Sequence, residues 1–589
     1  MIAQRTTIVA KTHAIAAGHD LATKAGLEVL ENGGNAIDAG VAAGIALGVL
    51  HSDLVNFAGV APIMIRLAET GEVVTIDGLG VWPKAANVEF FEENFGGEMP
   101  TGIHRTVVPA APAAWITALA RFGTMSFGDV AQYALRYARD GFPAFPVFSQ
   151  FIADNQDAYR QPSANAEIYL PGGKPPAVGD IFVQRDLAAT IQYMIDQERT
   201  AKGGRDAGLK AARDAFYKGD IAAKICAYHA ENGGFLTQED MSEYDVRFEQ
   251  PLQVRYGDAE IYGCGAWCQG ISLMQAFRML DGIDVAALGH NSADYIHTLT
   301  EVLKLTFADR EAHVADPAFI DVPVAEMLDD RYLAARRALI DPKRACPEMP
   351  PAGDFGGRPT NATSEGARGG TTSRPASDPH HTLPRDSGEL RDPGSADTSY
   401  VAVIDGAGNM FSATPSDTSA DTVVIPGTGL CPSSRGSQSR GTRTSINALA
   451  PGKRPRLTPN PALAVKDGKP LMAFGTPGGD VQIQAMIQVF INRFVFAMDL
   501  QDAVEAPRFA TYSFPSSFAP NTYHPGLLMM EESIPDAVLD DLLSRGHKAE
   551  RWQDKTWKAG SVLCVEYDPD GRRVLAGADT RRAGSARGR

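Results

Sequence analysis

The setting of Thr398 is the first feature of this chain that could support chemistry. A stretch rich in Gly, Pro, Ser and Thr ends at Asp397, and the strand-forming sequence YVAVI begins at residue 400. A threonine at the entrance of a strand is ordinarily a β-former and nothing more. If the chain is cut between Asp397 and Thr398, however, that threonine gains a free α-amine with an unperturbed pKa of about 7.7–8.0. The amine can take the hydroxyl proton, so one residue would serve as nucleophile and base.

A glycine-rich turn at residues 475–480, GTPGGD, is the second such feature. Consecutive glycines such as Gly478 and Gly479 let the backbone direct its N–H groups toward one point. Two donors aimed at a developing oxyanion would stabilise an acyl-transfer intermediate by several kcal/mol. The alternative is a plain strand-to-helix turn that uses glycine for a positive φ. A phosphate-binding loop is disfavoured because no Lys-Ser/Thr pair follows the glycines.

Hydrophobic periodicity indicates the elements that must position these residues. Apolar residues at helical spacing predict helices, and Gly33-Gly34 followed by Asn35 marks the end of one helix and the cap of the next. Alternation with a period of two predicts strands, several of them in hairpins around DGAGN, KDGK and DPDG. We expect helices at residues 20–31, 36–50, 111–121, 127–139, 207–228, 271–280, 293–313, 324–339, 481–496 and 534–544, and strands at 73–76, 260–262, 400–404, 410–414, 462–465, 470–474, 561–567 and 573–575. Helices beside antiparallel sheets predict a layered α+β fold.

The composition changes between residues 343 and 397, where large apolar residues are few and Gly, Pro, Ser and Thr are many. Such a stretch cannot bury enough surface to offset its ordering entropy, so we expect a flexible connector. A connector of this length inside an enzyme is either a linker or a functional segment. It divides the chain into residues 1–342, the connector 343–397, and residues 398–589.

The charge balance and the cysteine count disfavour several classes of protein. The 589 residues hold 55 Lys and Arg against 71 Asp and Glu, a net charge of −16, which disfavours nucleic-acid binding. The most apolar run, residues 36–50, is too short to cross a membrane, and the N-terminus lacks the apolar region of a signal peptide, so we expect a cytoplasmic protein. Six cysteines are too few for a disulfide scaffold, and the Cys264/Cys268 pair has no partner pair at zinc spacing.

Several motifs resemble, in the right order, those of the gamma-glutamyltransferase family of N-terminal-nucleophile hydrolases. They are AGLEVLENGGNAIDAGVAAGIALGVL (25–50), LTFADREAHVADPAF (305–319), DTSYVAVIDGAGNMFSAT (397–414), KRPRLTPNPALAVKDGKP (453–470), FGTPGGD (474–480) and EAPRF (505–509). The resemblance covers nearly the whole chain. It implies an αββα sandwich made from one precursor, which cuts itself before Thr398 into a heavy chain, 1–397, and a light chain, 398–589.

The resemblance also assigns roles to individual residues. Gly478 and Gly479 match the family's oxyanion hole, and Ser416 matches a threonine whose hydroxyl bonds the nucleophile. Thr418 stands where the family has an asparagine. The alternative for Ser416 is an ordinary turn residue.

The chain departs from the glutamyl-specific pattern at the positions that would bind substrate. The family arginine is missing from WPKAANVEFF (82–91), and a pair of serines is replaced by Leu457 and Thr458. The acidic residue that grips the substrate amine falls near Arg435, and such a charge reversal would cost several kcal/mol in a dry site. A free glutamyl head group therefore fits poorly. The residues of the motifs resemble those of amidohydrolase and acylase relatives, such as oxamate amidohydrolase-like proteins, more than those of glutamyl-specific members.

Two arginines are candidates for binding the substrate. Arg435, if it faces the pocket, would suit a carboxylate or oxo-acid acyl group through a bidentate fork. Arg105 is the second candidate, and Thr458 and Thr418 complete the binding residues that we expect. For both arginines the alternative is a structural or solvated ion pair. The segment WCQG (267–270) replaces a serine-glycine segment of the family's cleft, with core packing as its alternative role.

We therefore predict an autoprocessing N-terminal-threonine amidohydrolase or acyltransferase that acts on an amide of a small, carboxylate-bearing acyl group. It would need no metal or organic cofactor, and no nucleic acid or membrane. Its partners would be the amide substrate and the heavy and light chains of its own precursor. One alternative is true gamma-glutamyl transfer or glutathione hydrolysis, and another is an unprocessed, non-catalytic binding protein. The acyl group, the acceptor and a homo-oligomeric state are left open.

Overall fold

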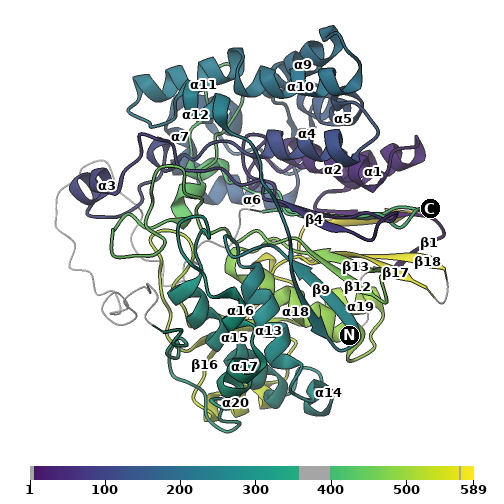
Figure 1. Ribbon diagram of the computed structural model, residues 1–589, viewed down its shortest axis with the longest axis vertical. Coiled ribbons are helices and arrows are strands. Elements are labelled where there is room, and N and C mark those ends of the chain that lie inside the picture. The colour runs from purple at the N-terminus through teal and green to yellow at the C-terminus, as the bar shows by residue number, and fades with distance from the viewer. Residues whose placement is uncertain (1–4, 357–397, 570–571) are drawn as a thin grey trace.

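The structure, a computed structural model, describes residues 5–356, 398–569 and 572–589. Two seven-stranded antiparallel sheets pack face to face, and a layer of helices covers the outer face of each sheet (Figure 1). This arrangement is the αββα sandwich expected from the sequence, and it buries one face of each sheet against helices and the other against the second sheet.

Residues 357–397, which include Asp397 of the predicted cleavage site, lie outside the described residues. Both sheets combine strands from the two sides of this segment. The first sheet runs β1 (Ile8–Ala10), β18 (Arg573–Ala578), β17 (Leu563–Asp568), β13 (Lys469–Gly475), β12 (Ala462–Lys466), β9 (Ala259–Gly263) and β8 (Leu252–Tyr256). The second runs β19 (Ser585–Gly588), β2 (Ala14–Ala17), β10 (Val401–Ile404), β11 (Met410–Ala413), β3 (Ile63–Arg66), β4 (Val73–Ile76) and β7 (Phe248–Glu249). Each part of the chain therefore contributes strands to each sheet.

The helices divide between the two outer faces (Figure 1). Over the second sheet lie α1 (Asp20–Glu31), α2 (Ala36–Leu50), α4 (Ala111–Phe122), α5 (Phe127–Asp140), α9 (Arg185–Thr200), α10 (Arg205–Tyr217) and α11 (Asp220–Glu231). Over the first sheet lie α13 (Gly270–Leu280), α15 (Ala293–His313), α18 (Gln482–Phe494), α19 (Leu500–Glu505) and α20 (Asp536–Ser544). Among the described residues, none of these helices is both long and apolar enough to cross a membrane.

Smaller elements complete the layers. They are α3 (Val88–Phe95), α6 (Pro146–Asp154), α7 (Gln156–Arg160), α8 (Ser163–Tyr169), α12 (Gln238–Glu243), α14 (Val285–Leu288), α16 (Val324–Met327), α17 (Asp330–Arg337), the two-stranded pair β5 (Phe142–Pro143) and β6 (Ile181–Phe182), and the three-stranded sheet β14 (Phe509–Thr511), β15 (Leu527–Glu531) and β16 (Lys548–Trp552). Between the two large sheets the core is rich in alanine, including Ala14, Ala16, Ala402, Ala473 and Ala576. Such small side chains let the two sheets approach closely.

Most predicted elements are confirmed, and α1, α2, α15 and β4 have the predicted bounds. Two predicted helices are wrong in their continuity. The pattern at 207–228 is interrupted at Lys218 and Gly219, because glycine costs about 1 kcal/mol in a helix and the chain begins a new helix there. The pattern at 324–339 is interrupted at Asp329, whose carboxylate accepts hydrogen bonds from the first N–H groups of α17.

Helix α2 is buried on every side, and its sequence shows how it is held. Asn35 caps its first turn, and the Asp38 carboxylate accepts the Asn35 N–H in return, which is a complete capping box. Glycine lets it approach its neighbours: a methyl group at Gly40 would overlap the ring of Phe411 on β11, and one at Gly44 would overlap the ring of Trp115. The hairpin that leads from Thr398 is thus packed directly against this helix.

We expect Gly40→Ala to destabilise the protein by about 1–3 kcal/mol, because the added methyl group overpacks the contact between α2 and β11. Urea unfolding at equilibrium measures the change. Gly406→Ala is the control, since the nearest atom to its added methyl group would be the Thr12 carbonyl oxygen at 3.5 Å. Equal stability of the two variants would contradict the close packing of α2.

Candidate active site

Thr398 lies three residues before the start of β10 and is 1% exposed. The register of the β10–β11 hairpin places Val401 opposite Ala413, and the same register continues outward to a bridge between Thr398 and Ser416. The two side-chain oxygens, Thr398 Oγ1 and Ser416 Oγ, lie 2.7 Å apart, which is a hydrogen bond. Ser416 is fixed from its other side by Val60, whose N–H and carbonyl both bond to its backbone. The structure thus brings together the two hydroxyls expected from the sequence.

Arg435 points at the same pair of hydroxyls. Its Nη2 donates to Ser416 Oγ at 2.5 Å, and its Nε lies 3.9 Å from Asp417 Oδ2. Its guanidinium also stacks 5.4 Å from the centre of the Phe518 ring. A guanidinium only donates, so it occupies a lone pair of Ser416 and makes that hydroxyl a better donor toward Thr398. These contacts favour a positioning role for Arg435 over direct binding of a substrate carboxylate.

Asp417 is a site residue that the sequence analysis missed. Its φ is 135°, a strained conformation for a residue other than glycine, and strain of this kind tends to gather at functional sites. The side-chain and backbone donors of Ser434 bond to Oδ1 at 2.6 and 2.9 Å, and Ser433 Oγ bonds to Oδ2 at 2.5 Å. Burial raises the pKa of Asp417, and Arg435 works in the opposite direction. The sequence signal was its place between Ser416 and Thr418, which alone does not distinguish it from a turn aspartate.

The glycine turn at the end of β13 has three successive peptide groups fixed through their carbonyl oxygens. Thr476 Oγ1 donates to Pro477 O at 2.8 Å, Val481 N–H donates to Gly478 O at 2.9 Å, and Gln269 Nε2 donates to Gly479 O at 3.0 Å. The carbonyl and the following N–H of a trans peptide point in opposite directions. Fixing the Pro477 and Gly478 carbonyls therefore aims the Gly478 and Gly479 N–H groups away from these partners.

The backbone conformation of this turn requires glycine, as the sequence predicted. Gly478 has φ 124° and Gly479 has φ 55°, both in the left-handed half of the map. Within the described part of the chain, neither N–H donates to a protein acceptor. Two such donors held by a rigid turn are suited to stabilise an oxyanion.

The nucleophile strand and the glycine turn lie at the same edge of the sandwich. Tyr400, two residues after Thr398, packs so closely on Gly475 that a methyl group there would overlap its ring. Gly475 is the last residue of β13 and precedes the turn. Because side chains alternate along a strand, Thr398 and Tyr400 face the same side, toward the first sheet.

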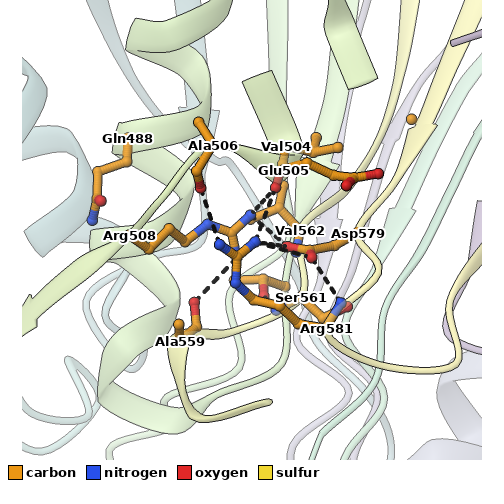
Figure 2. A network of polar contacts seen from close by, with 12 residues as sticks. Gln488, Val504, Glu505, Ala506, Arg508, Ala559, Ser561, Val562, Asp579 and Arg581 are labelled. Carbon is orange, nitrogen blue, oxygen red and sulfur yellow. Dashed lines mark hydrogen bonds and ion pairs between the residues drawn. The ribbon is translucent and has the colours of Figure 1, made fainter. Parts of the chain in front are cut away.

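A buried network of ions supports the loop that underlies the glycine turn (Figure 2). Arg508 pairs with Asp579 at 2.5 Å and donates to Ala559 O at 3.1 Å, while Arg581 bonds the same carboxylate at 3.1 Å. Burial opposes the charged form of Asp579, but the two guanidinium groups hold its pKa below the ordinary value. Asp579 also accepts the Val562 N–H at 3.3 Å, so the loop at 559–562 is fixed at both ends.

That loop contacts the glycine turn directly. Ser561 N–H donates to Thr476 Oγ1 at 2.7 Å, and Gly560 lies against Gly478. The Thr476 hydroxyl thus accepts one hydrogen bond and donates another to Pro477 O. Through these two hydrogen bonds of Thr476, the loop held by the ion network orients the turn.

The remaining residues predicted from the sequence lie around this centre with structural contacts of their own. Thr458 Oγ1 accepts a hydrogen bond from Gln438 Nε2 at 2.9 Å, and its carbonyl accepts one from Gln269. Thr418 caps a short 3₁₀ turn, Ser419–Asp421, by accepting the Ala420 N–H. Arg105 is buried and donates to the carbonyl oxygens of Met99 and Pro100, with Asp421 at 3.5 Å. These contacts indicate a structural role for Arg105 and not a substrate-binding one.

Two groups of side chains resemble metal ligands. Burial raises the pKa of Cys264 well above its ordinary value, and the Cys268 thiol donates a hydrogen bond to Pro459 O. The two cysteines therefore pack as apolar side chains. His297, Glu301 and His547 offer ligand atoms within 4.8 Å of one another. The buried ammonium of Lys304, 2.8 Å from Glu301, would repel a cation there.

An αββα sandwich with a buried threonine at the entrance of a strand fits an N-terminal-nucleophile amidohydrolase. Residues 22–588 match the profile of the family described as Gamma-glutamyltranspeptidase. The chain belongs to that family, and it is an amidohydrolase of the N-terminal-nucleophile type.

Its relatives include acylases and glutathione hydrolases. The Acylase ACY 1 proenzyme of Pseudomonas sp. (strain SE83) is 34% identical over 582 residues, which cover 97% of this chain and 92% of the relative. The Glutathione hydrolase proenzyme of Bacillus subtilis (strain 168) is 27% identical, with 98% and 92% covered. The crystal structure of cephalosporin acylase from Bacillus halodurans superposes with a TM-score of 0.84 at 25% identity and covers 100% of this chain and 98% of that one.

We expect Thr476→Val to lower kcat for a chromogenic anilide roughly 10-fold, with KM nearly unchanged. Removing one oxyanion donor outright costs about 100- to 1000-fold, and this variant only loosens a donor that remains. Thr476→Ser, which keeps the hydroxyl, is the control and should stay within about twofold of the wild type. A valine variant as active as the serine variant would show that the hydrogen bonds of Thr476 do not orient the turn.

Proposed function

We propose that the chain is a precursor that cuts itself between Asp397 and Thr398, and that the product hydrolyses an amide of a small, carboxylate-bearing acyl group. The observation that carries the proposal is the 2.7 Å contact between Thr398 Oγ1 and Ser416 Oγ, at the edge where the glycine turn lies. Two relatives, the Pseudomonas acylase and the Bacillus subtilis glutathione hydrolase, are proenzymes, which supports the cleavage.

In self-cleavage, Thr398 Oγ attacks the Asp397 carbonyl carbon, and the bond from that carbon to the Thr398 nitrogen breaks. Water then hydrolyses the resulting ester, which leaves the Asp397 carboxylate and a free Thr398 amine. The fragments are a heavy chain, 1–397, and a light chain, 398–589. Because each fragment contributes strands to both sheets, the two fragments would remain held by one core.

In turnover, the Thr398 amine takes the hydroxyl proton, and Oγ attacks the substrate amide carbon. Gly478 and Gly479 N–H groups bind the oxyanion, and Ser416, oriented by Arg435, donates to the nucleophile. The protonated amine gives its proton to the leaving nitrogen, and water releases the acyl group from its ester with Thr398. This sequence requires no metal and no organic cofactor.

The charges around Ser416 restrict which acyl group the site can bind. A glutamyl head group carries an ammonium, and the family's acidic partner for it falls near Arg435, which is buried and positively charged here. Two like charges at short range in a poorly solvated site repel by several kcal/mol. An acyl group with a carboxylate and no ammonium is therefore the better fit.

Thr398→Ala should remain a single chain on a denaturing gel and show no amide turnover, because the attacking oxygen is gone. The wild type should give two fragments, with the light chain beginning at Thr398 by mass spectrometry. Thr398→Ser, which keeps a hydroxyl, should still cleave itself, at a reduced rate. An intact wild-type chain that hydrolyses an amide would contradict the proposal, and an intact, inactive one would support the binding-protein alternative.

A matched pair of substrates tests the acyl group. N-Glutaryl-p-nitroanilide and γ-glutamyl-p-nitroanilide differ only in the α-ammonium, and we expect kcat/KM to favour the glutaryl compound by at least about 10-fold, equivalent to about 1.4 kcal/mol. Release of p-nitroaniline measures both rates. Faster release from the glutamyl compound, increased further by glycylglycine, would instead establish gamma-glutamyl transfer, the second candidate that the Bacillus subtilis relative supports.

A further inference from the structure

Three buried or half-buried arginines share two carboxylates behind the glycine turn. Arg310 bonds Asp480 at 2.5 Å and Glu311 at 2.9 Å, and Arg456 bonds Glu311 at 2.7 Å. Arg440 lies 3.6 Å from the second oxygen of Glu311. Among the described residues, this cluster holds one positive charge more than its carboxylates balance. An excess charge in a poorly solvated place attracts an anion.

Arg440 is the member of the cluster best placed to receive that anion. Its 3.6 Å contact is the longest of the four, and its buried Nη1 has no hydrogen-bond partner in the described part of the chain. Its side chain is 17% exposed, against 0% for Arg310 and 2% for Arg456, so it is the arginine of the cluster nearest to solvent. Burial lowers the pKa of Arg440 to about 10, and Glu311 opposes that shift, so the group stays charged at neutral pH.

The cluster is connected to the catalytic centre on two sides. Asp480 follows the oxyanion glycine Gly479, and Arg310 donates to Gln269 Oε1 at 3.4 Å while Gln269 holds the Gly479 carbonyl. On the other side, Arg440 follows the 3₁₀ turn Arg435–Gln438. Arg435, the first residue of that turn, donates a hydrogen bond to Ser416. Arg440 therefore lies on the segment that connects the second hydroxyl to the region behind the oxyanion turn.

We infer that Arg440 is the residue that binds the carboxylate of the acyl group, an inference that rests on the proposed function. The sequence pointed to Arg435 for this task, but Arg435 already donates to Ser416 and lies beside Asp417. Arg440 Nη1, which is buried and has no hydrogen-bond partner among the described residues, offers a charge-assisted hydrogen bond to a carboxylate. The class of ligand is a short dicarboxylic acid, or its monoamide, in which the second carboxyl carbon is the reacting centre.

The test measures binding of glutarate to the self-cleaved wild-type protein by isothermal titration calorimetry, with glutaramide as the uncharged counterpart. We expect glutarate to bind and glutaramide to bind at least about 10-fold more weakly. Arg440→Gln should weaken glutarate binding at least about 10-fold and leave glutaramide unchanged. Arg440→Lys keeps the charge but loses the two-nitrogen fork of the guanidinium. Its affinity for glutarate should lie between those of the wild type and of Arg440→Gln.

Arg443→Gln is the matched control, since Arg443 lies on the same loop, 58% exposed, and pairs with Glu92 at 2.8 Å. It should bind glutarate as the wild type does. Melting temperatures and self-cleavage of each variant on a gel establish that it folds. If Arg440→Gln folds, cleaves itself and binds glutarate like the wild type, the inference is wrong while the proposed function stands. It is also wrong if active wild-type protein binds no glutarate. Failure of the wild type to cleave itself would instead count against the proposed function.

Discussion

The register of one hairpin decides which side chain can meet Thr398. The turn between β10 and β11 sets Val401 opposite Ala413, and that spacing carries Ser416 to the position opposite Thr398. A slip of one residue would turn every side chain of a strand to the other face of the sheet. The contact of Phe411 with Gly40 on α2 disfavours such a slip, because a slip would turn that ring away from the helix. The geometry of the two hydroxyls is thus a consequence of how the sandwich packs.

Buried charges surround the hydroxyl pair and the glycine turn, and most of them are paired. Arg435 with Asp417, Arg310 with Asp480, and Arg508 with Asp579 each hold a loop that ends at the reacting groups. Burying an ion pair adds little net stability, because desolvation offsets much of the attraction. Breaking one leaves an uncompensated charge, so each pair allows its loop few alternative positions. In this protein the pairs specify loop geometry more than they add stability.

The sequence was sufficient to predict much of the fold and the pairing of Thr398 with Ser416, for identifiable reasons. Helices α1 and α2 have a capped start and a strong apolar pattern, and Gly478 and Gly479 need a conformation that few other residues adopt. Asp417, Gln269 and Arg310 act through partners far away along the chain, such as Ser434, Gly479 and Asp480. No local pattern records such a partner, so these positioning residues, and the contacts of Arg435, required coordinates.

The presence of strands from both parts of the chain in each sheet bears on how the molecule unfolds. A protein whose two segments formed separate sheets could melt in two steps, one segment after the other. Here β10 and β11 lie between β2 and β3, while β12 pairs with β9 and β18 pairs with β1, so neither segment retains a complete sheet alone. Nicking the backbone before Thr398 would therefore leave two polypeptides whose shared sheets unfold together as one cooperative unit.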